Sequence, residues 1–317
     1  MKNQCTLKNI EAVILGHAVA DALGVPVEFV DRKKIDKNPV NEMRGFGVYP
    51  YPAGTWSDDT SMTLAALDSL SNGVVNWNDI MTKFGDWLQD GAYTPMGETF
   101  DAGRTCIKSI IDYFAHNCKP LECGQTNENS NGNGSLMRIL PFVLYCMYNK
   151  QADNDIELIH KASCLTHAHR RSQIACGIYA EIIWQIIDNP VKESVYTGLS
   201  KAYEIYSKED EFKHYSRIFD KNFSNTDRAL IKSSGYVVDT LEAAIWCLLT
   251  TDSYSECVLK AVNLGGDTDT VAAVSGGLSG ALYGYDSIPK EWLDTLARYD
   301  YIEELCEKAY IGWKKKD

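Results

Sequence analysis

The chain has 317 residues and carries 31 lysine and arginine residues against 43 aspartate and glutamate residues, a formal net charge of −12. Its length allows a full hydrophobic core, and 45% hydrophobic and 23% charged residues exclude a disordered chain. The negative charge argues against an extended nucleic-acid partner, because a phosphate backbone requires a positive surface. We therefore expect one globular domain over residues 1–317, in which the acid excess serves solubility, metal binding or both.

The sequence gives no sign of a membrane or of disulfides. Its most apolar windows, such as residues 271–283, are short and contain several glycines, and residues 1–5 lack the apolar stretch of a signal peptide. Ten cysteines lie scattered without a Cys-x-x-Cys pair, which excludes a zinc ribbon and a thioredoxin motif. We expect buried, reduced cysteines and a cytoplasmic location without membrane contact.

Helical periodicity dominates the chain, and the evidence for strands is thin. Residues 25–30 and 46–49 are short, lie beside proline or glycine, and are predicted as loops. The fold class predicted is all-α, a single compact orthogonal bundle of about a dozen helices. The predicted helices cover residues 10–23, 59–72, 77–89, 102–116, 135–148, 155–165, 172–188, 193–207, 236–250, 254–263, 269–283 and 300–313.

The first candidate motif is Thr55-Trp-Ser-Asp-Asp-Thr60, at the start of the predicted helix 59–72. Ser57 or Asp58 can cap this helix, so a plain helix start is one interpretation. A cap needs one oxygen, however, whereas this motif offers several in succession, and adjacent carboxylates repel each other unless a cation neutralises them. Metal ligation is the second interpretation, and the motif alone leaves both open.

The second candidate motif is Gly265-Gly-Asp-Thr-Asp-Thr270, where the glycine pair allows a tight turn before the apolar helix 269–283. An EF-hand loop beginning at Asp267 is excluded, since Ala272 and Leu278 stand where it needs glycine and glutamate. A haloacid-dehalogenase-type phosphatase also uses Asp-x-Asp-x-Thr, but here no strand precedes the motif and too little chain follows. A helix cap explains one of the two aspartates and not both.

The two motifs supply enough negative charge to balance two divalent cations, from Asp58, Asp59, Asp267 and Asp269. Ser57 and Thr270 add neutral oxygens. An all-oxygen donor set selects hard ions such as Mg²⁺ or Mn²⁺ over zinc. A pair of ions about 3.5–4 Å apart can hold and polarise a bridging water near neutral pH. The sequence therefore predicts a metal site at helix N-termini.

With these motifs in place, the chain resembles the ADP-ribosylglycohydrolase family, relatives of the dinitrogenase-reductase-activating glycohydrolase and the ADP-ribosyl-acceptor hydrolases. The segments that carry the resemblance follow the family's order: residues 21–28, 57–60, 133–141, 166–167, 235–244 and 265–270. They span most of the chain, and the two acidic motifs with the Asn-Gly-Ser loop between them are highly specific. One departure is Ala20, where the family usually has glycine.

The resemblance implies a divalent-metal-dependent hydrolase that cleaves the glycosidic bond between ADP-ribose and a modified acceptor, such as a protein arginine. It implies that two Mg²⁺ or Mn²⁺ ions are bound by Ser57, Asp58, Asp59, Asp267, Asp269 and Thr270. The catalytic residues it implies are Glu28, Asp267 and Asp269, with Glu28 as a proton shuttle or as a gate over the metals. Asp21, on the first helix, could instead brace the metal loops from behind.

The diphosphate of such a ligand needs a cradle that does not depend on net positive charge. Asn133, Gly134 and Ser135 precede a helix predicted to start near Leu136, and N–H groups at a helix N-terminus bind anions. A polar loop that ends in a serine cap is the alternative. Arg138, one turn further on, either pairs with a phosphate or braces neighbouring loops.

Two further side chains follow from the resemblance, which places His167 beside the ADP-ribose and lets Tyr236 stack on or edge the ligand. An aromatic residue at a helix start is more often part of the core, so Tyr236 keeps that alternative. His167 and His169 are spaced too poorly, and too far from cysteines, for a zinc site. His169 is predicted to be structural.

Two other functions were weighed against the hydrolase. A non-catalytic ADP-ribose-binding or crystallin-like relative is disfavoured by the intact aspartates, and an all-α Mg²⁺-dependent diphosphate enzyme is disfavoured because Met62 breaks its Asp-Asp-x-x-Asp motif. We expect a monomer that acts on an ADP-ribosylated protein or other acceptor and releases free ADP-ribose. The acceptor stays open between arginine, serine, a nucleobase and a small molecule, because its choice depends on loops such as residues 39–52 and 96–101.

Overall fold

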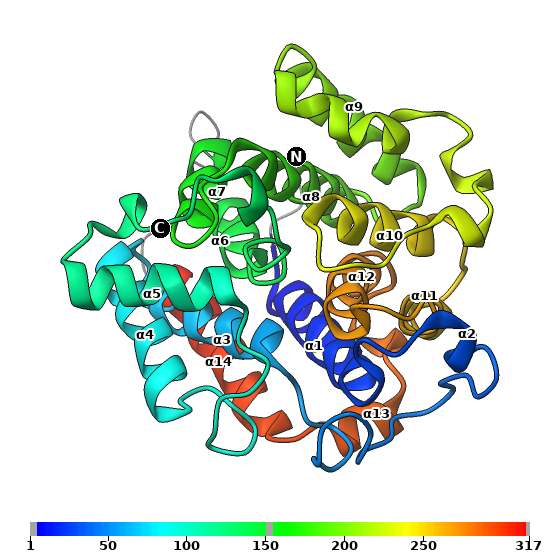
Figure 1. Ribbon diagram of the computed structural model, residues 1–317, viewed down its shortest axis with the longest axis horizontal. Coiled ribbons are helices and arrows are strands. Elements are labelled where there is room, and N and C mark those ends of the chain that lie inside the picture. The colour runs from blue at the N-terminus through cyan, green and yellow to red at the C-terminus, as the bar shows by residue number, and fades with distance from the viewer. Residues whose placement is uncertain (1–4, 150–154, 315–317) are drawn as a thin grey trace.

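The computed structural model describes residues 5–149 and 155–314, which are helical and contain no β-strand (Figure 1). This confirms the all-α prediction for the described part of the chain. Of the segment 1–5, in which no signal-peptide stretch was predicted, residues 1–4 lie outside the described part. The α-helices are α1 (Leu7–Gly24), α2 (Arg32–Ile35), α3 (Asp58–Leu70), α4 (Trp77–Asp90), α5 (Arg104–His116), α6 (Leu140–Asn149), α7 (Asp155–Cys164), α8 (Arg170–Asp188), α9 (Glu193–Tyr206), α10 (Val237–Leu249), α11 (Tyr254–Val262), α12 (Thr268–Tyr283), α13 (Lys290–Thr295) and α14 (Tyr299–Lys314).

Each predicted helix overlaps an observed one, whereas short elements were missed. Helices α2 and α13 have 4 and 6 residues, too few for a helical period to register. The 3₁₀ helix η4 (Asp210–Phe219) was missed as well, since its side chains repeat every three residues rather than every 3.6. Short segments of this kind are fixed by their tertiary contacts.

One predicted boundary is wrong at a place that matters for function. The helix predicted over residues 135–148 begins only at Leu140, and the residues from Gly134 to Arg138 form turns. Pro141 explains the late start, because a proline has no N–H to continue a helix backwards and is tolerated only in the first turn. The Asn133 loop therefore does not open directly into a helix.

Helix α1 corrects the expectation that no segment resembles a membrane span. Residues Leu7–Val27 are long and apolar enough to cross a membrane by length and composition, but 94% of that window is buried inside the protein. Figure 1 shows α1 near the middle of the molecule, with α3 and α14 on one side and α11 and α12 on the other. Its hydrophobicity is that of a central core helix, since neighbouring helices cover it on several sides.

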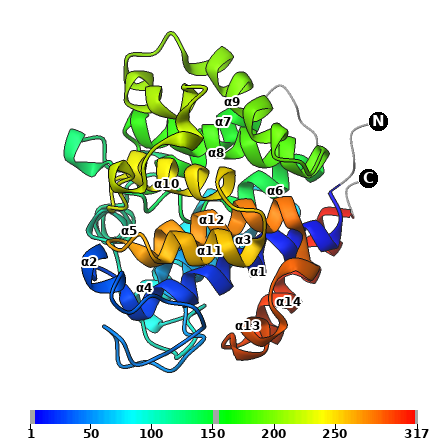
Figure 2. The ribbon, with the colours of Figure 1, turned by 90° about the vertical axis from the view of Figure 1, so that its right-hand side faces the viewer.

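The closest helix pair in the fold is α1 with α12, which run antiparallel and side by side (Figure 2). A Cβ added at Gly276 would lie 2.3 Å from the carbonyl oxygen of Gly16, and one at Gly280 would lie 2.1 Å from that of Ala12. Side chains any larger would force the backbones apart. The C-terminal end of α1 is consequently held against the N-terminal start of α12.

This close approach predicts the effect of Gly280→Ala. Alanine normally stabilises a helix by about 1 kcal/mol relative to glycine, but here its methyl group would overlap the backbone of Ala12. We expect the free energy of unfolding, measured by urea denaturation, to fall by about 1–3 kcal/mol. Gly103→Ala is the control, because a Cβ at Gly103 meets nothing within 4 Å. A Gly280→Ala protein as stable as the control would contradict the close packing.

Candidate functional site

The acidic side chains predicted from both motifs meet where α1 ends and where α3 and α12 begin. The buried carboxyl groups there, each at most 6% exposed, belong to Asp21, Glu28, Asp58, Asp59, Asp267 and Asp269. Ionised carboxylates at this depth are unstable unless hydrogen bonds or cations compensate their charge. The hydrogen bonds around each group therefore show which carboxylates are already satisfied by the protein.

Asp21 of α1 caps the start of α3. Its carboxylate accepts hydrogen bonds from the Ser57 N–H at 3.0 Å, from the Thr60 N–H at 3.1 Å and from the Thr60 hydroxyl at 2.6 Å. The Ser57 hydroxyl accepts the Asp59 N–H at 3.3 Å. Because Asp21 and Ser57 accept hydrogen bonds from the N–H groups at the start of α3, this helix does not need the carboxylates of its own first turn as caps. The bracing role expected for Asp21 agrees with this geometry.

Asp59 and Asp269 each present one carboxylate oxygen that the protein leaves without a partner. Asp59 Oδ2 accepts the hydroxyls of Ser57 at 3.0 Å and Thr270 at 3.2 Å, and Asp269 Oδ1 accepts the Thr270 N–H at 2.9 Å. Asp59 Oδ1 and Asp269 Oδ2 are buried and have no hydrogen bond. Burial, reinforced by neighbouring carboxylates, raises the pKa of both groups well above their ordinary value. Both oxygens are therefore available to a cation.

Glu28 lies at the end of η1 (Val25–Val27), and its carboxyl belongs to a second cluster of acidic side chains, with Asp101 and Asp269. Its side chain is 3% exposed, and its Oε2 has no hydrogen-bond partner. Burial, followed by the nearby charge of Asp101, raises the pKa of Glu28 to about 9. Glu28 therefore retains its proton near neutral pH while no cation is bound.

Asp101 is a site residue that the sequence analysis missed. Its half-buried carboxylate accepts a hydrogen bond from the Tyr49 hydroxyl at 3.1 Å, and its backbone has a φ of 52°. No pattern surrounds it in the sequence, although the loop 96–101 was expected to influence the acceptor. Only the folding of this loop against Tyr49 and Glu28 brings Asp101 to the acidic groups.

Two sets of carboxylate oxygens are close enough to hold a metal ion. The oxygens of Asp21, Asp59 and Asp269 lie within 4.8 Å of one another, and so do those of Glu28, Asp101 and Asp269. Asp269 belongs to both sets. Asp58 and Asp267 fall outside both sets, although Asp58 lies close enough to Asp101 for that charge to contribute to its raised pKa, after burial.

Asp267 is positioned by the Asn133 loop. The Asn133 side-chain amide donates to Asp267 Oδ2 and to the Thr240 hydroxyl, both at 3.0 Å. A Cβ added at Gly235 would lie 2.9 Å from Asp267 Oδ2. The structure thus brings Asn133 to the second acidic motif, and Thr240 is a further contact that the sequence did not indicate.

The turn after Asn133 differs from the helix start that was predicted as a diphosphate cradle. Gly134 packs tightly, since an added Cβ would lie 2.8 Å from the His167 ring and 2.9 Å from Cys106 Sγ. The Ser135 side chain is fully buried, and its oxygen accepts the Ser163 hydroxyl at 2.9 Å. The helix predicted to begin in this turn starts later, at Leu140, and the anion-binding role of the turn stays a prediction.

His167 lies beside this turn as a buried, neutral imidazole. Burial lowers the pKa of His167 to about 3, and the charge of Arg138 acts in the same direction. His167 Nδ1 is 2.9 Å from the Thr166 hydroxyl, which in turn accepts a hydrogen bond from Arg138 at 2.8 Å. When the Thr166 hydroxyl donates to Nδ1, the remaining ring proton is on Nε2, which faces Gly132. Arg138, fully buried and stacked on Phe84, braces the loops.

Tyr236 is half-buried at the start of α10 and pairs with the Asn133 loop through a bridge to Gly132. The Arg171 guanidinium lies 5.8 Å from the centre of its ring. The structure thus places Tyr236 beside the loop that holds Asp267, with one ring face covered by a cation. His169 caps α8 by accepting the Arg171 N–H at 3.2 Å, in agreement with its predicted structural role.

The cysteines fit a protein without disulfides. All ten are free, and only Cys118 and Cys164 are more than marginally accessible. Burial raises the pKa of Cys106, whose Sγ lies beside Gly134, to about 11, so its thiol stays protonated. Nucleophilic thiol chemistry at this site is therefore unfavourable.

The fold and the site define the class of protein: an all-helical enzyme whose buried carboxylates meet at helix ends and suit a hard cation. A family model described as ADP-ribosylglycohydrolase matches residues 3–317. The chain is 32% identical over 316 residues to ADP-ribosylarginine hydrolase Tri1 of Serratia proteamaculans. The match covers 98% of this chain and 81% of that protein. It is 31% identical over 285 residues to the ADP-ribosyl-dinitrogen reductase glycohydrolase of Rhodospirillum rubrum, covering 89% of this chain and 88% of that protein.

A solved structure agrees with these relatives. The chain superposes on an ADP-ribosylglycohydrolase-related protein complex with a TM-score of 0.81 at 30% identity, covering 96% of this chain and 98% of that one. The protein therefore belongs to the ADP-ribosylglycohydrolase family, a family of enzymes. The resemblance stated from the sequence motifs is confirmed.

The raised carboxyl pKa values predict how stability depends on pH in the metal-free protein. Folded Glu28 keeps its proton up to a pH of about 9, whereas the unfolded chain releases it near the ordinary value of 4.5, so the native state binds more protons between these limits. We expect urea unfolding in the presence of EDTA to show a loss of about 2–4 kcal/mol as the pH rises from about 5 to 9.

Glu28→Gln provides the matched comparison for this pH dependence. The pKa of Asp21 is raised only to about 6, so the upper part of the slope comes from Glu28 together with Asp58, Asp59 and Asp269, whose pKa values burial also raises. The variant should flatten the slope above about pH 6, because glutamine does not titrate. Identical slopes for the wild type and Glu28→Gln would contradict the assignment.

Proposed function

We propose that this protein hydrolyses the glycosidic bond between the anomeric carbon of ADP-ribose and an acceptor, with arginine of a modified protein as the favoured acceptor. The observation that carries the proposal is the pair of buried, unpartnered oxygens of Asp59 and Asp269, together with the Glu28 carboxyl close to Asp269. Membership of the family supports cleavage at ADP-ribose. The names of two relatives, both ADP-ribosylarginine hydrolases, support arginine as the acceptor.

The proposal includes a divalent-metal cofactor, two Mg²⁺ or Mn²⁺ ions. The residues proposed to hold them are Ser57, Asp58, Asp59, Asp267, Asp269 and Thr270. Glu28 and Asp101 also lie close to Asp269, whereas Asp58 and Asp267 fall outside the two sets of neighbouring oxygens. The donors are all oxygens, and the unpartnered ones are buried, which suits hard cations that need their charge compensated. When bound, such cations orient ribose hydroxyls and polarise the attacking water.

The proposed catalytic residues are Glu28, Asp267 and Asp269. Glu28 lies beside Asp269, and its carboxyl is placed to transfer a proton to the departing group. Tyr49 and Asp101 hold each other in place next to Glu28. Asp267 is oriented by Asn133, which supports a fixed direction for its carboxylate toward the ligand.

The proposed substrate-binding residues are Asn133, Gly134, Ser135, His167 and Tyr236. Neutral His167 can donate one hydrogen bond to a phosphate oxygen, and Gly134 lets the turn pack directly against the His167 ring, where a side chain would not fit. Ser135 contributes by fixing the turn, since its hydroxyl is already bonded to Ser163. Tyr236 offers the edge of an aromatic ring to the ligand.

The setting proposed for this activity is a single domain over residues 1–317 that acts as a monomer in the cytoplasm and releases free ADP-ribose. Free, mostly buried cysteines support a reducing compartment. A non-catalytic ADP-ribose-binding relative is the competing function, and it would bind free ADP-ribose without turning over any substrate.

The metal assignment predicts that Asp269→Asn loses metal binding while the fold is kept. The amide is nearly isosteric with the carboxylate but removes one charge and one unpartnered oxygen from the residue shared by both oxygen sets. We expect the affinity for Mn²⁺, measured by calorimetry, to fall by at least about tenfold with an unchanged circular dichroism spectrum. Asp79→Asn, in the first turn of α4, is the control and should bind Mn²⁺ as the wild type does.

The activity is tested by release of ADP-ribose from matched substrates. With Mg²⁺ or Mn²⁺ present, mass spectrometry should detect release from an ADP-ribosyl-arginine protein faster than from ADP-ribosyl-serine or ADP-ribosylated nucleic acid. Glu28→Gln should lower kcat by about 10²–10⁴-fold, because glutamine cannot transfer a proton. Binding of ADP-ribose without release from any substrate would refute the hydrolase and favour the non-catalytic relative.

A further inference from the structure

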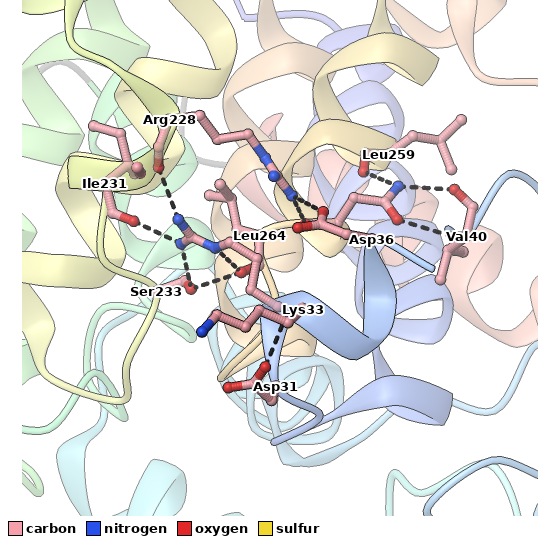
Figure 3. A network of polar contacts seen from close by, with 12 residues as sticks. Asp31, Lys33, Asp36, Val40, Arg228, Ile231, Ser233, Leu259 and Leu264 are labelled. Carbon is pink, nitrogen blue, oxygen red and sulfur yellow. Dashed lines mark hydrogen bonds and ion pairs between the residues drawn. The ribbon is translucent and has the colours of Figure 1, made fainter. Parts of the chain in front are cut away.

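Arg32, at the start of α2, donates to four acceptors on two segments distant in the sequence. Its Nε donates to the carbonyl oxygen of Leu264 at 2.5 Å, and its Nη1 to that of Arg228 at 2.7 Å. Its Nη2 donates to the Ile231 carbonyl at 2.6 Å and to the Ser233 hydroxyl at 3.3 Å. Figure 3 shows Ile231, Ser233 and Leu264 gathered around this guanidinium.

These acceptors are all neutral. Among the described residues, the structure records no carboxylate within ion-pair distance of Arg32. The pKa of Arg32 is lowered, because burial removes the guanidinium from water and the charge of Arg228 repels it. An arginine used in this way connects backbones through its planar fork, which a lysine cannot reproduce.

Both segments that Arg32 holds lead directly to Asp267. Leu264 precedes the Gly265-Gly266 turn into Asp267, and the Ser233 carbonyl accepts the Asp267 N–H at 2.8 Å. The Ser233 hydroxyl also lies 3.4 Å from the Leu264 carbonyl, so the two segments are joined to each other as well as to Arg32. The position of the Asp267 backbone thus depends on both.

The same turn is bonded to the segment that carries Glu28. The Phe29 N–H donates to the Gly266 carbonyl at 2.6 Å, and the Gly266 N–H donates to the Val30 carbonyl at 3.1 Å. Phe29 follows Glu28 directly, and its backbone has a φ of 54°. Two reciprocal hydrogen bonds therefore fix the spacing between Glu28 and the turn before Asp267.

The Gly265-Gly266 turn is too tightly packed to accommodate a shift of the neighbouring backbone. Gly265 and Gly266 have φ values of 70° and 75°, which favour glycine. A Cβ at Gly265 would lie 2.8 Å from the backbone N of Arg32, and one at Gly266 would lie 2.2 Å from the carbonyl oxygen of Ser233. A shift of the Arg32 segment is consequently transmitted to Asp267 rather than taken up by the loop.

We propose that Arg32 is a positioning residue: its guanidinium joins the segments of Glu28 and Asp267 and so sets the geometry of the acidic centre. The inference rests on the proposed function in taking Asp267 as a metal ligand and Glu28 as the proton donor. Arg32 itself touches neither the metal nor the substrate. Its removal lowers metal affinity and kcat together, because both depend on where these two carboxyl groups lie.

The test compares Arg32→Gln with Arg32→Lys and with the control Arg228→Gln. Arg228 donates to Asp36 at 2.8 Å and to the carbonyl oxygen of Asn263, the C-cap residue of α11, in the same network. Its backbone carbonyl, which Arg32 uses, survives the substitution. Calorimetry with Mn²⁺, steady-state kinetics and thermal unfolding are measured for each full-length variant. Arg32→Gln should weaken Mn²⁺ binding by about 10–100-fold and lower kcat more than it changes KM.

The variants separate positioning from stability. Arg32→Lys should lie between wild type and Arg32→Gln, since lysine keeps the charge but not the fork, and Arg228→Gln should bind Mn²⁺ as the wild type does. A purely structural role would lower the melting temperature of Arg32→Gln and leave the Mn²⁺ affinity of the folded protein unchanged, which would overturn the proposal.

Two further outcomes keep the test decisive. If Arg32→Gln does not fold, Ser233→Ala replaces it. This substitution removes one acceptor of the Arg32 guanidinium and keeps the Ser233 carbonyl that accepts the Asp267 N–H. Wild-type Mn²⁺ affinity in both Ser233→Ala and Arg32→Lys overturns the proposal. If the wild type binds Mn²⁺ but hydrolyses no substrate, the proposed function fails, and the calorimetric comparison still decides the role of Arg32.

Discussion

The close antiparallel packing of α1 against α12 is the constraint on which the acidic centre depends. At the end of this pair, a Cβ at Gly24 would lie 2.4 Å from the Cα of Asp269, and the Thr268 hydroxyl donates to the Gly24 carbonyl at 2.8 Å. Asp21, one turn earlier on α1, is thereby held beside Asp269. The apolar contacts along the rest of both helices offset the repulsion that these carboxylates would otherwise exert.

Burial of so many acids makes the charge state of the centre depend on what it binds. Without a cation, the raised pKa values of Glu28, Asp59 and Asp269 keep protons on the centre. A divalent cation can replace those protons, which couples metal binding to pH and to stability. On the proposed function, this coupling also explains how a chain with a net charge of −12 binds an anionic diphosphate, because the bound cations supply the local positive charge.

The sequence predicted those parts of the centre in which neighbours along the chain remain neighbours in space. Residues 57–60 and 267–270 each lie within one helix start, so their clustered oxygens were visible as motifs. Asp101 and Arg32 could not be found in this way. Asp101 reaches the centre through a loop held by Tyr49, and Arg32 acts on carbonyl oxygens, which every residue possesses.

The prediction of the fold likewise succeeded where a local pattern decides the structure and failed where it does not. Long helices with an apolar period were found, whereas the start of α6 was placed too early because Pro141 restricts the backbone before it more strongly than the apolar period indicates. The consequence reached the site, since a helix N-terminus at Asn133 would have offered amides to an anion. In the observed turn, the Asn133 side chain donates to Asp267 and is not free to cap a helix.

The choice between a helix cap and a metal ligand, undecided from the sequence, depends on partners that are distant along the chain. The amides at the start of α3 are satisfied by Asp21 of another helix, so Asp59 keeps one oxygen unpartnered. At the start of α12, Asp267 is the N-cap residue but makes no side-chain cap, because its carboxylate accepts Asn133. Each helix start thus leaves carboxylate oxygen available at the centre, and each does so through a residue from a distant part of the chain, Asp21 for α3 and Asn133 for α12.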